Sequence, residues 1–277
     1  MMPIVLAALA AVAFGTADFS GGKASRHADP IAVTVVSQIL SVPLLVVLVL
    51  LVPGTPHLGD LGWGLLAGVA GAGGVMLLYR ALAGGMMVVV APVTAITAAV
   101  VPIIAGLFTA SFPGVLALTG AGLAVLAIAL VSLGESGGGR AVPARLVGLA
   151  LAAGALFGVF YTFLGQADES AGMWPVAAVR ASSIAVGLAL ALGTRKQLRL
   201  GRREFGLAAV AGLLDSGANA LFLAAAARGH LSIVAAVAAL YPASTVLLAL
   251  AVDRERLRVV QITGLGFAAG ALVLASL

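Results

Sequence analysis

The chain has 277 residues, of which 62% are hydrophobic and only 9% are charged, and its mean hydropathy is +1.20. Soluble domains carry roughly a quarter charged residues, so this chain has too few polar side chains to cover a water-facing surface. It contains no cysteine, which excludes disulfides, thiolate-bound metals and a cysteine nucleophile.

Apolar residues form continuous runs almost from one end of the chain to the other, separated by short polar breaks. A helix needs about 20 mostly apolar residues to cross a bilayer, whereas membrane β-strands are shorter and alternate in polarity. We therefore predict an all-α, polytopic membrane protein of about ten transmembrane helices. The predicted spans are residues 2–20, 31–52, 61–82, 87–108, 113–133, 145–165, 174–192, 204–227, 231–252 and 257–277.

Basic residues are unevenly distributed between the two sides of this ten-span arrangement. The chain has 15 Lys and Arg residues, and all lie on one side except Arg180, within a span, and Arg228, on the other side. Such a bias marks the cytoplasmic side of a membrane protein. We therefore expect a multi-pass protein of the plasma (inner) membrane with both termini outside. The net charge of +5 indicates orientation, not nucleic-acid binding.

The sequence repeats itself at an offset of about 144 residues, where ALAGGMMVVVAPVTAITAAV aligns with AAARGHLSIVAAVAALYPAS without a gap. The aligned glycines are Gly85 with Gly229, Gly120 with Gly264 and Gly122 with Gly266. We predict two five-helix repeats, residues 1–133 and 145–277, joined by a Gly-rich linker over 134–144. Because each repeat has an odd number of spans, the second is inverted relative to the first. Inverted repeats are typical of secondary transporters, with a substrate site near mid-membrane.

Small residues recur at four-residue spacing along several spans. The pairs are Gly64 with Gly68, Gly154 with Gly158 and Gly266 with Gly270. Such pairs let neighbouring helices approach closely inside a bilayer, so we predict a packing role for them.

Three stretches carry a family resemblance. In WPVAAVRASSIAV, Pro175 is followed five residues later by Arg180, and in AVDRERLRVVQITGLGFAAGALVL, Glu255 precedes a Gly-rich last helix. YRALAGGMMVVVAPVTAITAAVVPIIAGL contains the proline-bearing fourth helix. Along nearly the whole chain, this pattern resembles the EamA family of the drug/metabolite transporter superfamily.

The resemblance implies ten helices around a central cavity lined mainly by helices one, three, four, six, eight and nine. It also implies transport of small metabolites, often amino-acid or drug efflux. The first half departs from the family pattern, since Val35, Ser111 and Phe14 stand where the family has its arginine, its glutamate and its frequent tryptophan. These departures concern scaffold positions and leave the substrate undetermined.

Asp215 is a carboxylate near the middle of the eighth predicted span. A charge there costs about 2.5 to 3.5 kcal/mol in membrane insertion. Helical spacing puts Gly212, Asp215, Asn219 and Phe222 on one face, which must look into protein or a wet cavity. Asp215 is then either a proton or cation site, with Asn219 hydrogen-bonding the substrate, or a buried partner of Arg180. Neutralisation by a raised pKa is a third possibility.

Asp18 lies near the cytoplasmic end of the first predicted span. It is a second candidate for substrate binding or coupling, and the alternative is that its side chain reaches interfacial water.

Arg180 and the prolines Pro92 and Pro242 form a second group of candidates. We interpret Arg180 as part of a structural or gating ion pair. Each proline removes a helix hydrogen bond, and Pro92 and Pro242 lie in repeat-related helices, so a kinked pair of helices could act as a gate. Ordinary kinks without a gating role are the alternative.

Hydroxyl and aromatic side chains near these prolines or in other spans could contact a substrate. Ser and Thr also bond routinely to their own helix carbonyls, and Tyr also favours the membrane interface. The candidates are Tyr79, Thr94, Thr97, Tyr161, Tyr241 and Ser244.

The sequence offers no catalytic or metal-binding pattern. His27, His57 and His230 match no metal-ligand spacing, and no Gly-Lys-Ser phosphate loop is present to use ATP. We therefore expect no enzyme activity, metal or cofactor. The favoured function is a secondary transporter, an amino-acid or drug-type exporter of small metabolites working by alternating access. The alternatives are an importer or facilitator and a membrane-embedded enzyme acting on a lipid-linked substrate.

The expected partners are a small-molecule substrate and the lipid bilayer, with no nucleic acid, and the sequence leaves the oligomeric state open.

Overall fold

The computed structural model describes residues 2–108, 119, 122–123, 125–127, 129–130, 142–226, 228, 237–238, 240–255 and 259–275. Within these ranges all regular structure is helical, which confirms the predicted all-α class. In the part of the chain that the structure describes, six helices are long and apolar enough to cross a membrane. Most of the fifth predicted span, the start of the ninth, most of the linker and Ser111 lie outside the described residues.

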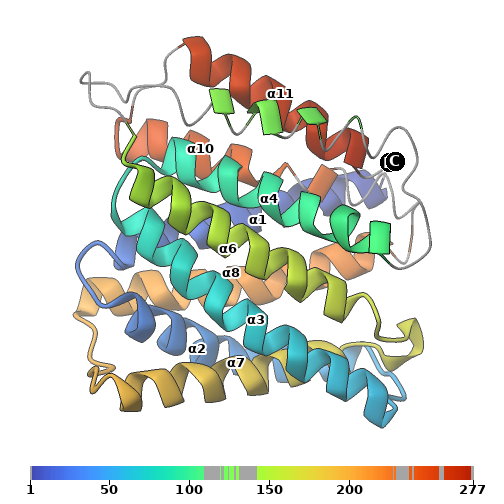
Figure 1. Ribbon diagram of the computed structural model, residues 1–277. Coiled ribbons are helices and arrows are strands. Elements are labelled where there is room, and N and C mark those ends of the chain that lie inside the picture. Colours follow the sequence, from blue (N-terminus) through green and yellow to red (C-terminus); the bar gives the residue numbers. More distant parts are fainter. Residues whose placement is uncertain are drawn as a thin grey trace.

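The helices, with the numbering of Figure 1, are α1 (Met2–Ala24), α2 (Pro30–Leu51), α3 (Leu58–Ala83), α4 (Met87–Phe108), α6 (Ala144–Leu164), the 3-10 helix η1 (Glu169–Ala171), α7 (Trp174–Gly193), α8 (Arg202–Ala226), α10 (Tyr241–Val252) and α11 (Val259–Ala275).

Short polar segments set the helix ends. Asp29 caps α2, because its Oδ1 accepts a hydrogen bond from the Ile31 amide at 3.0 Å, and Pro30 occupies the first helical position. At the start of α3, Asp60 Oδ2 accepts from the His57 amide at 2.8 Å. These side chains satisfy backbone N–H groups that a helix leaves without an internal partner.

Ion pairs and a backbone hydrogen bond between the loops that connect the helices show which helix ends lie together at each end of the bundle. At the basic end, Lys23 at the end of α1 pairs with Asp253 at 2.7 Å, and Lys196 after α7 pairs with Asp29 before α2 at 2.8 Å. At the opposite end, the Thr55 amide between α2 and α3 donates to the carbonyl between α6 and α7 at 3.0 Å. Thus α1 ends where α2 begins, at the basic end, while α6 ends at the opposite end.

The two halves interlock through equivalent pairs of helices. α1 packs along α8, and α6, which holds the place of α1 in the second half, packs along α3. In the same way α2 contacts α8 as α7 contacts α3, and α1 contacts α10 as α6 contacts α4. Figure 1 shows α2 and α7 side by side at one edge of the bundle, with α10 and α11 at the other. Together with the opposite directions of α1 and α6, this pairing is that of two inverted repeats.

Glycines on α3 and α6 allow this interlocking. A Cβ added at Gly68 would lie 2.8 Å from the Cα of Val179 on α7, and one at Gly154 would lie 2.6 Å from the Cβ of Thr97 on α4. Gly64 and Gly158 face the same neighbours as closely. The predicted packing role is confirmed for these two pairs. At Gly270 an added Cβ would lie 3.3 Å from the Leu123 side chain, and at Gly266 it would meet none of the described residues within 4 Å, so for this third pair the packing role stays a prediction.

The ninth predicted span is not one continuous helix. The chain turns at Leu240, whose amide donates to the Val237 carbonyl at 3.2 Å, and α10 then begins with Pro242 in its first turn. α4, in contrast, continues from Met87 to Phe108 through Pro92. Pro242, in the second half, therefore lies at a helix break, whereas Pro92, in the first half, lies within a continuous helix.

Replacing Gly68 by alanine should loosen the contact between α3 and α7. The new methyl group would collide with the backbone of Val179, and such overpacking costs about 1 to 3 kcal/mol. We expect a lower Tm for the purified protein in detergent. Gly62→Ala is the matched control on the same helix, because its Cβ would enter open space. An equal effect of the two substitutions would contradict the packing role.

Candidate functional site

A cavity of about 570 Å³ lies between the two halves. Its lining residues come from α1, α2, α3, α4, α6, α7 and α8 and from the break before α10. All the helices expected from the family resemblance contribute, and α2 and α7 contribute as well. The volume falls within the range of about 300 to 1,000 Å³ that small-molecule sites occupy.

The polar centre of the cavity is an ion pair between α7 and α8. Arg180 Nη2 donates to Asp215 Oδ2 at 2.8 Å and to Ser216 Oγ at 3.1 Å. Arg180 Nη1 donates to Gln38 Oε1 on α2, which also accepts from Ser183 Oγ at 3.1 Å. Three helices from both halves thus meet at one guanidinium.

The two members of this pair differ in their access to the cavity. The Arg180 side chain is only 6% exposed, whereas that of Asp215 is 39% exposed. The guanidinium is therefore shielded by its partners, and the carboxylate presents part of its surface to the cavity. The sequence left open whether Asp215 is a buried partner of Arg180. In the structure the two side chains form this pair.

Asn219 lies one helical turn after Asp215 and also lines the cavity. Its Nδ2 donates to the backbone carbonyl of Asp215 at 2.8 Å, so the amide is oriented by its own helix. Gly212, one turn before, lies directly against the Ser37 carbonyl of α2. This close approach is what brings Gln38 within reach of Arg180.

Asp18 lines the cavity from α1. Because α1 continues to Ala24, this carboxylate lies more than one helical turn inside the helix end. Asp215, from α8, lines the same cavity. Among the described residues Asp18 makes no ion pair, so it is the cavity acid without a counter-charge.

The three tyrosines of the chain all line the cavity. Tyr161 packs edge-on against Phe160, with ring centroids 5.0 Å apart, and Tyr241 packs edge-on against Phe14 at 6.2 Å. Tyr79, near the basic end of α3, is buried. The cavity wall is therefore aromatic around a small number of polar groups.

Five predicted site residues lie elsewhere. Thr94 Oγ1 donates to a carbonyl of α6 at 3.2 Å, Thr97 Oγ1 to one of its own helix at 2.8 Å, and Ser244 Oγ to one of α1 at 3.0 Å. None of the three is among the described residues that line the cavity. Pro92 and Pro242 border a separate apolar cavity of about 300 Å³ beside α4, α10 and α11.

Gln38, Ser37 and Ser183 line the cavity but were not predicted as site residues. Each is a polar side chain inside an apolar span, which is the signal that identified Asp215. Applied to α2, this signal would have found Gln38. Phe157 and Phe160 gave no comparable signal, because aromatic residues in a membrane helix also face lipid.

The basic end is closed by charges over an apolar cluster. Asp253 pairs with Lys23 at 2.7 Å and with Arg26 at 2.8 Å, and both oxygens of Glu255 accept from the first two amides of α4 at 3.1 Å. A carboxylate at a helix N-terminus also complements the helix dipole. These contacts join α1 and α4 of the first half to the end of α10 in the second.

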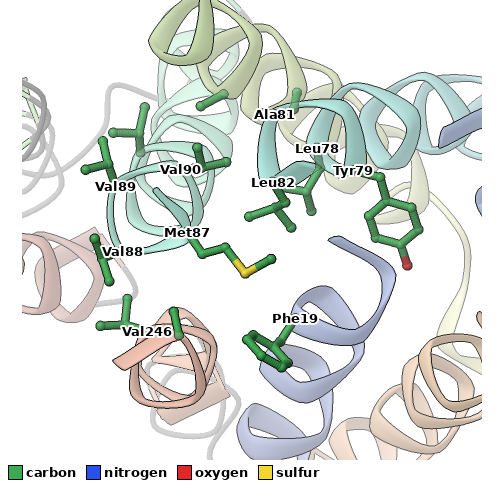
Figure 2. Close-up of a cluster of buried hydrophobic side chains, with 14 of the residues drawn as sticks. Phe19, Leu78, Tyr79, Ala81, Leu82, Met87, Val88, Val89, Val90 and Val246 are labelled. Atoms are coloured by element: carbon green, nitrogen blue, oxygen red, sulfur yellow. The ribbon is translucent and has the colours of Figure 1, made fainter. Parts of the chain in front are cut away.

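Beneath these charges, the side chains of Phe19, Leu82 and Met87 converge, with Val246 beside them (Figure 2). All belong to one buried cluster near the basic end. The cavity lining, in contrast, extends to Leu164 at the end of α6, at the opposite end of the bundle.

Comparison with known families matches the EamA-like transporter family to residues 1–133 and 145–277. The chain belongs to the EamA-like transporter family. The resemblance predicted from the sequence motifs is thereby confirmed. Membership makes the protein an integral membrane transporter of the drug/metabolite type, with a small-molecule substrate. A search of the curated proteins finds no match to this chain.

Replacing Arg180 by methionine should destabilise the protein, because Asp215 and Gln38 would lose a buried donor. Breaking a buried pair costs about 3 to 5 kcal/mol, and we expect less here because Asp215 is partly exposed. Adding Asp215→Asn should restore part of the loss by removing the uncompensated charge. A double-mutant cycle on unfolding in detergent should give a coupling of about 1 to 2 kcal/mol. A coupling near zero would show that the two side chains do not depend on one another.

Proposed function

We propose that the protein is a secondary transporter that exports a small amphipathic metabolite, of amino-acid or drug type, by alternating access. The observation that carries the proposal is the cavity between two inverted halves with an acid on its wall, Asp18, that forms no ion pair with any described residue. Inverted halves can exchange conformations about a fixed central site, which alternates its access between the two sides.

The proposed orientation places the basic end in the cytoplasm and both termini outside, in the plasma (inner) membrane. Lys23, Arg26 and Lys196 at the basic end support this, because basic residues accumulate on the cytoplasmic side. The cavity, which extends to the opposite end, then belongs to a state that releases substrate outward.

The two parts of the chain that are proposed to change their mutual contacts are residues 1–133 and 145–277, connected by residues 134–144. Contacts of Lys23 and Arg26 with Asp253, and of Glu255 with α4, join these parts at the basic end. They must separate before the cavity can receive a substrate from the cytoplasm. The cluster of Lys23, Arg26, Asp253 and Glu255 is therefore the cytoplasmic gate.

Asp18 is the proposed coupling group, with Asp215 as the second cavity acid. Arg180 neutralises Asp215 in place, whereas a proton or a cation can neutralise Asp18. Protonated and ionised Asp18 then differ in substrate affinity, and only such differential binding lets a proton gradient drive transport.

Transport is tested first by comparing metabolites in the medium around cells with and without the protein. We expect at least one small metabolite to accumulate outside the expressing cells. Its flux from proteoliposomes should need a proton gradient but no ATP. Asp18→Asn should abolish the gradient dependence at equal protein abundance, because Asn cannot take up a proton. Unchanged gradient-driven flux in that variant would rule out the coupling role.

The gate is tested with a single cysteine at Ser20, which is 5% exposed in this closed state, in a chain that has no other cysteine. Asp253→Asn should speed its labelling by a membrane-impermeant maleimide applied from the basic end. A partly exposed pair contributes about 1 kcal/mol, so the population open at that end should rise about fivefold. Glu204→Gln, at the basic end of α8, is the control. Equal labelling rates in both variants would contradict the gate.

A further inference from the structure

We infer that the cavity takes a monovalent organic cation with an aromatic or similarly bulky apolar body. This inference rests on the proposed transport function and names the substrate class of the same cavity. Among the described residues, three charged side chains line the cavity, namely Asp18, Arg180 and Asp215. One positive and two negative charges leave a net charge of −1 when all three are ionised.

Arg180, the one cation among the described residues of the lining, is not free to bind a substrate anion. Both terminal nitrogens of Arg180 donate to protein groups, Nη1 to Gln38 and Nη2 to Asp215 and Ser216. With the side chain only 6% exposed, a substrate carboxylate could bond to these terminal nitrogens only by displacing the protein groups that hold them. An anionic group in this cavity would therefore be desolvated without a counter-charge, which is costly.

A substrate ammonium group, unlike a carboxylate, would find a counter-charge in the cavity. Asp18 lines the cavity without an ion-pair partner among the described residues, and Asp215 presents a carboxylate that is 39% exposed. A bound cation neutralises the charge of Asp18 and is also attracted by the partly exposed carboxylate of Asp215. The charge arrangement thus distinguishes an amine from the amino acid that has the same side chain.

The aromatic wall determines the rest of the substrate. Phe14 and Tyr241 form one edge-on pair and Phe160 and Tyr161 another, and all four rings line the cavity. Ring faces attract a cation within about 6 Å and stack on a flat apolar group. A small hydrated metal ion would leave most of the 570 Å³ and these rings without contacts.

Binding to the purified protein in detergent tests this inference. Phenethylamine, phenylalanine and 3-phenylpropionate share one aromatic body and present, respectively, a cation, a zwitterion and an anion at pH 7. We expect calorimetry to give a Kd for phenethylamine at least tenfold lower than for either of the others. Equal or tighter binding of phenylalanine, or no binding of phenethylamine, would overturn the inference.

Variants of the cavity acid complete the test. Asp18→Asn should raise the Kd for phenethylamine at least tenfold, and Asp18→Glu, which keeps the charge, should largely retain binding. Asp168→Asn, in the connection after α6 and outside the cavity, should leave the Kd unchanged. Unaltered phenethylamine binding in Asp18→Asn would overturn the assignment.

Binding in detergent requires neither a gradient nor movement of the halves. Cation binding without flux would therefore refute the transport proposal and leave the ligand class intact. Flux of a metabolite that is not a cation, with no phenethylamine binding, would refute the ligand class and leave the transport proposal intact.

Discussion

A charge inside a bilayer has no water to solvate it, and the centre of this protein is organised around that constraint. The Arg180 guanidinium meets it by bonding Gln38, Asp215 and Ser216 from two neighbouring helices. These bonds to the terminal nitrogens of one buried cation join α2, α7 and α8. The same bonds use up the positive charge of the cavity, which leaves its electrostatic character to the carboxylates.

Such a centre requires helices to approach one another more closely than side chains normally permit. Gly212 admits the backbone of α2 beside Ser37, and Gly68 admits the backbone of α7 beside Val179. Without the first contact Gln38 would not reach Arg180. The glycines therefore support function indirectly, by setting the distances over which the polar side chains act. Lipid cannot supply this attraction, because inside a bilayer helix contacts depend on packing and interhelical hydrogen bonds.

Hydropathy predicted the helical class, because a long continuous apolar run can satisfy its backbone in a membrane only as a helix, internal repetition predicted the two repeats, and the sequence motifs predicted the family. Helical spacing also placed Asp215 and Asn219 on one face. Spacing identifies a face but not the helix opposite it, so the contribution of Gln38 was missed. Thr94 and Ser244 bond to carbonyls of neighbouring helices, and such partners depend on packing that the sequence does not express.

The two repeats share their helix arrangement but not their charged residues. Val35 is the first-half counterpart of Arg180, and it packs against Gly187 of α7 without any charge. At the repeat offset of 144, Asp215 corresponds to Gly71, which also lines the cavity. The cavity therefore carries its charged pair on one copy only, while Asp18 comes from the other. A symmetric scaffold can exchange the roles of its halves, and an asymmetric charge set lets the two resulting states bind a ligand with different affinities. Such a difference is what lets a bound ligand shift the equilibrium between the two states, because a ligand with equal affinity for both states shifts nothing.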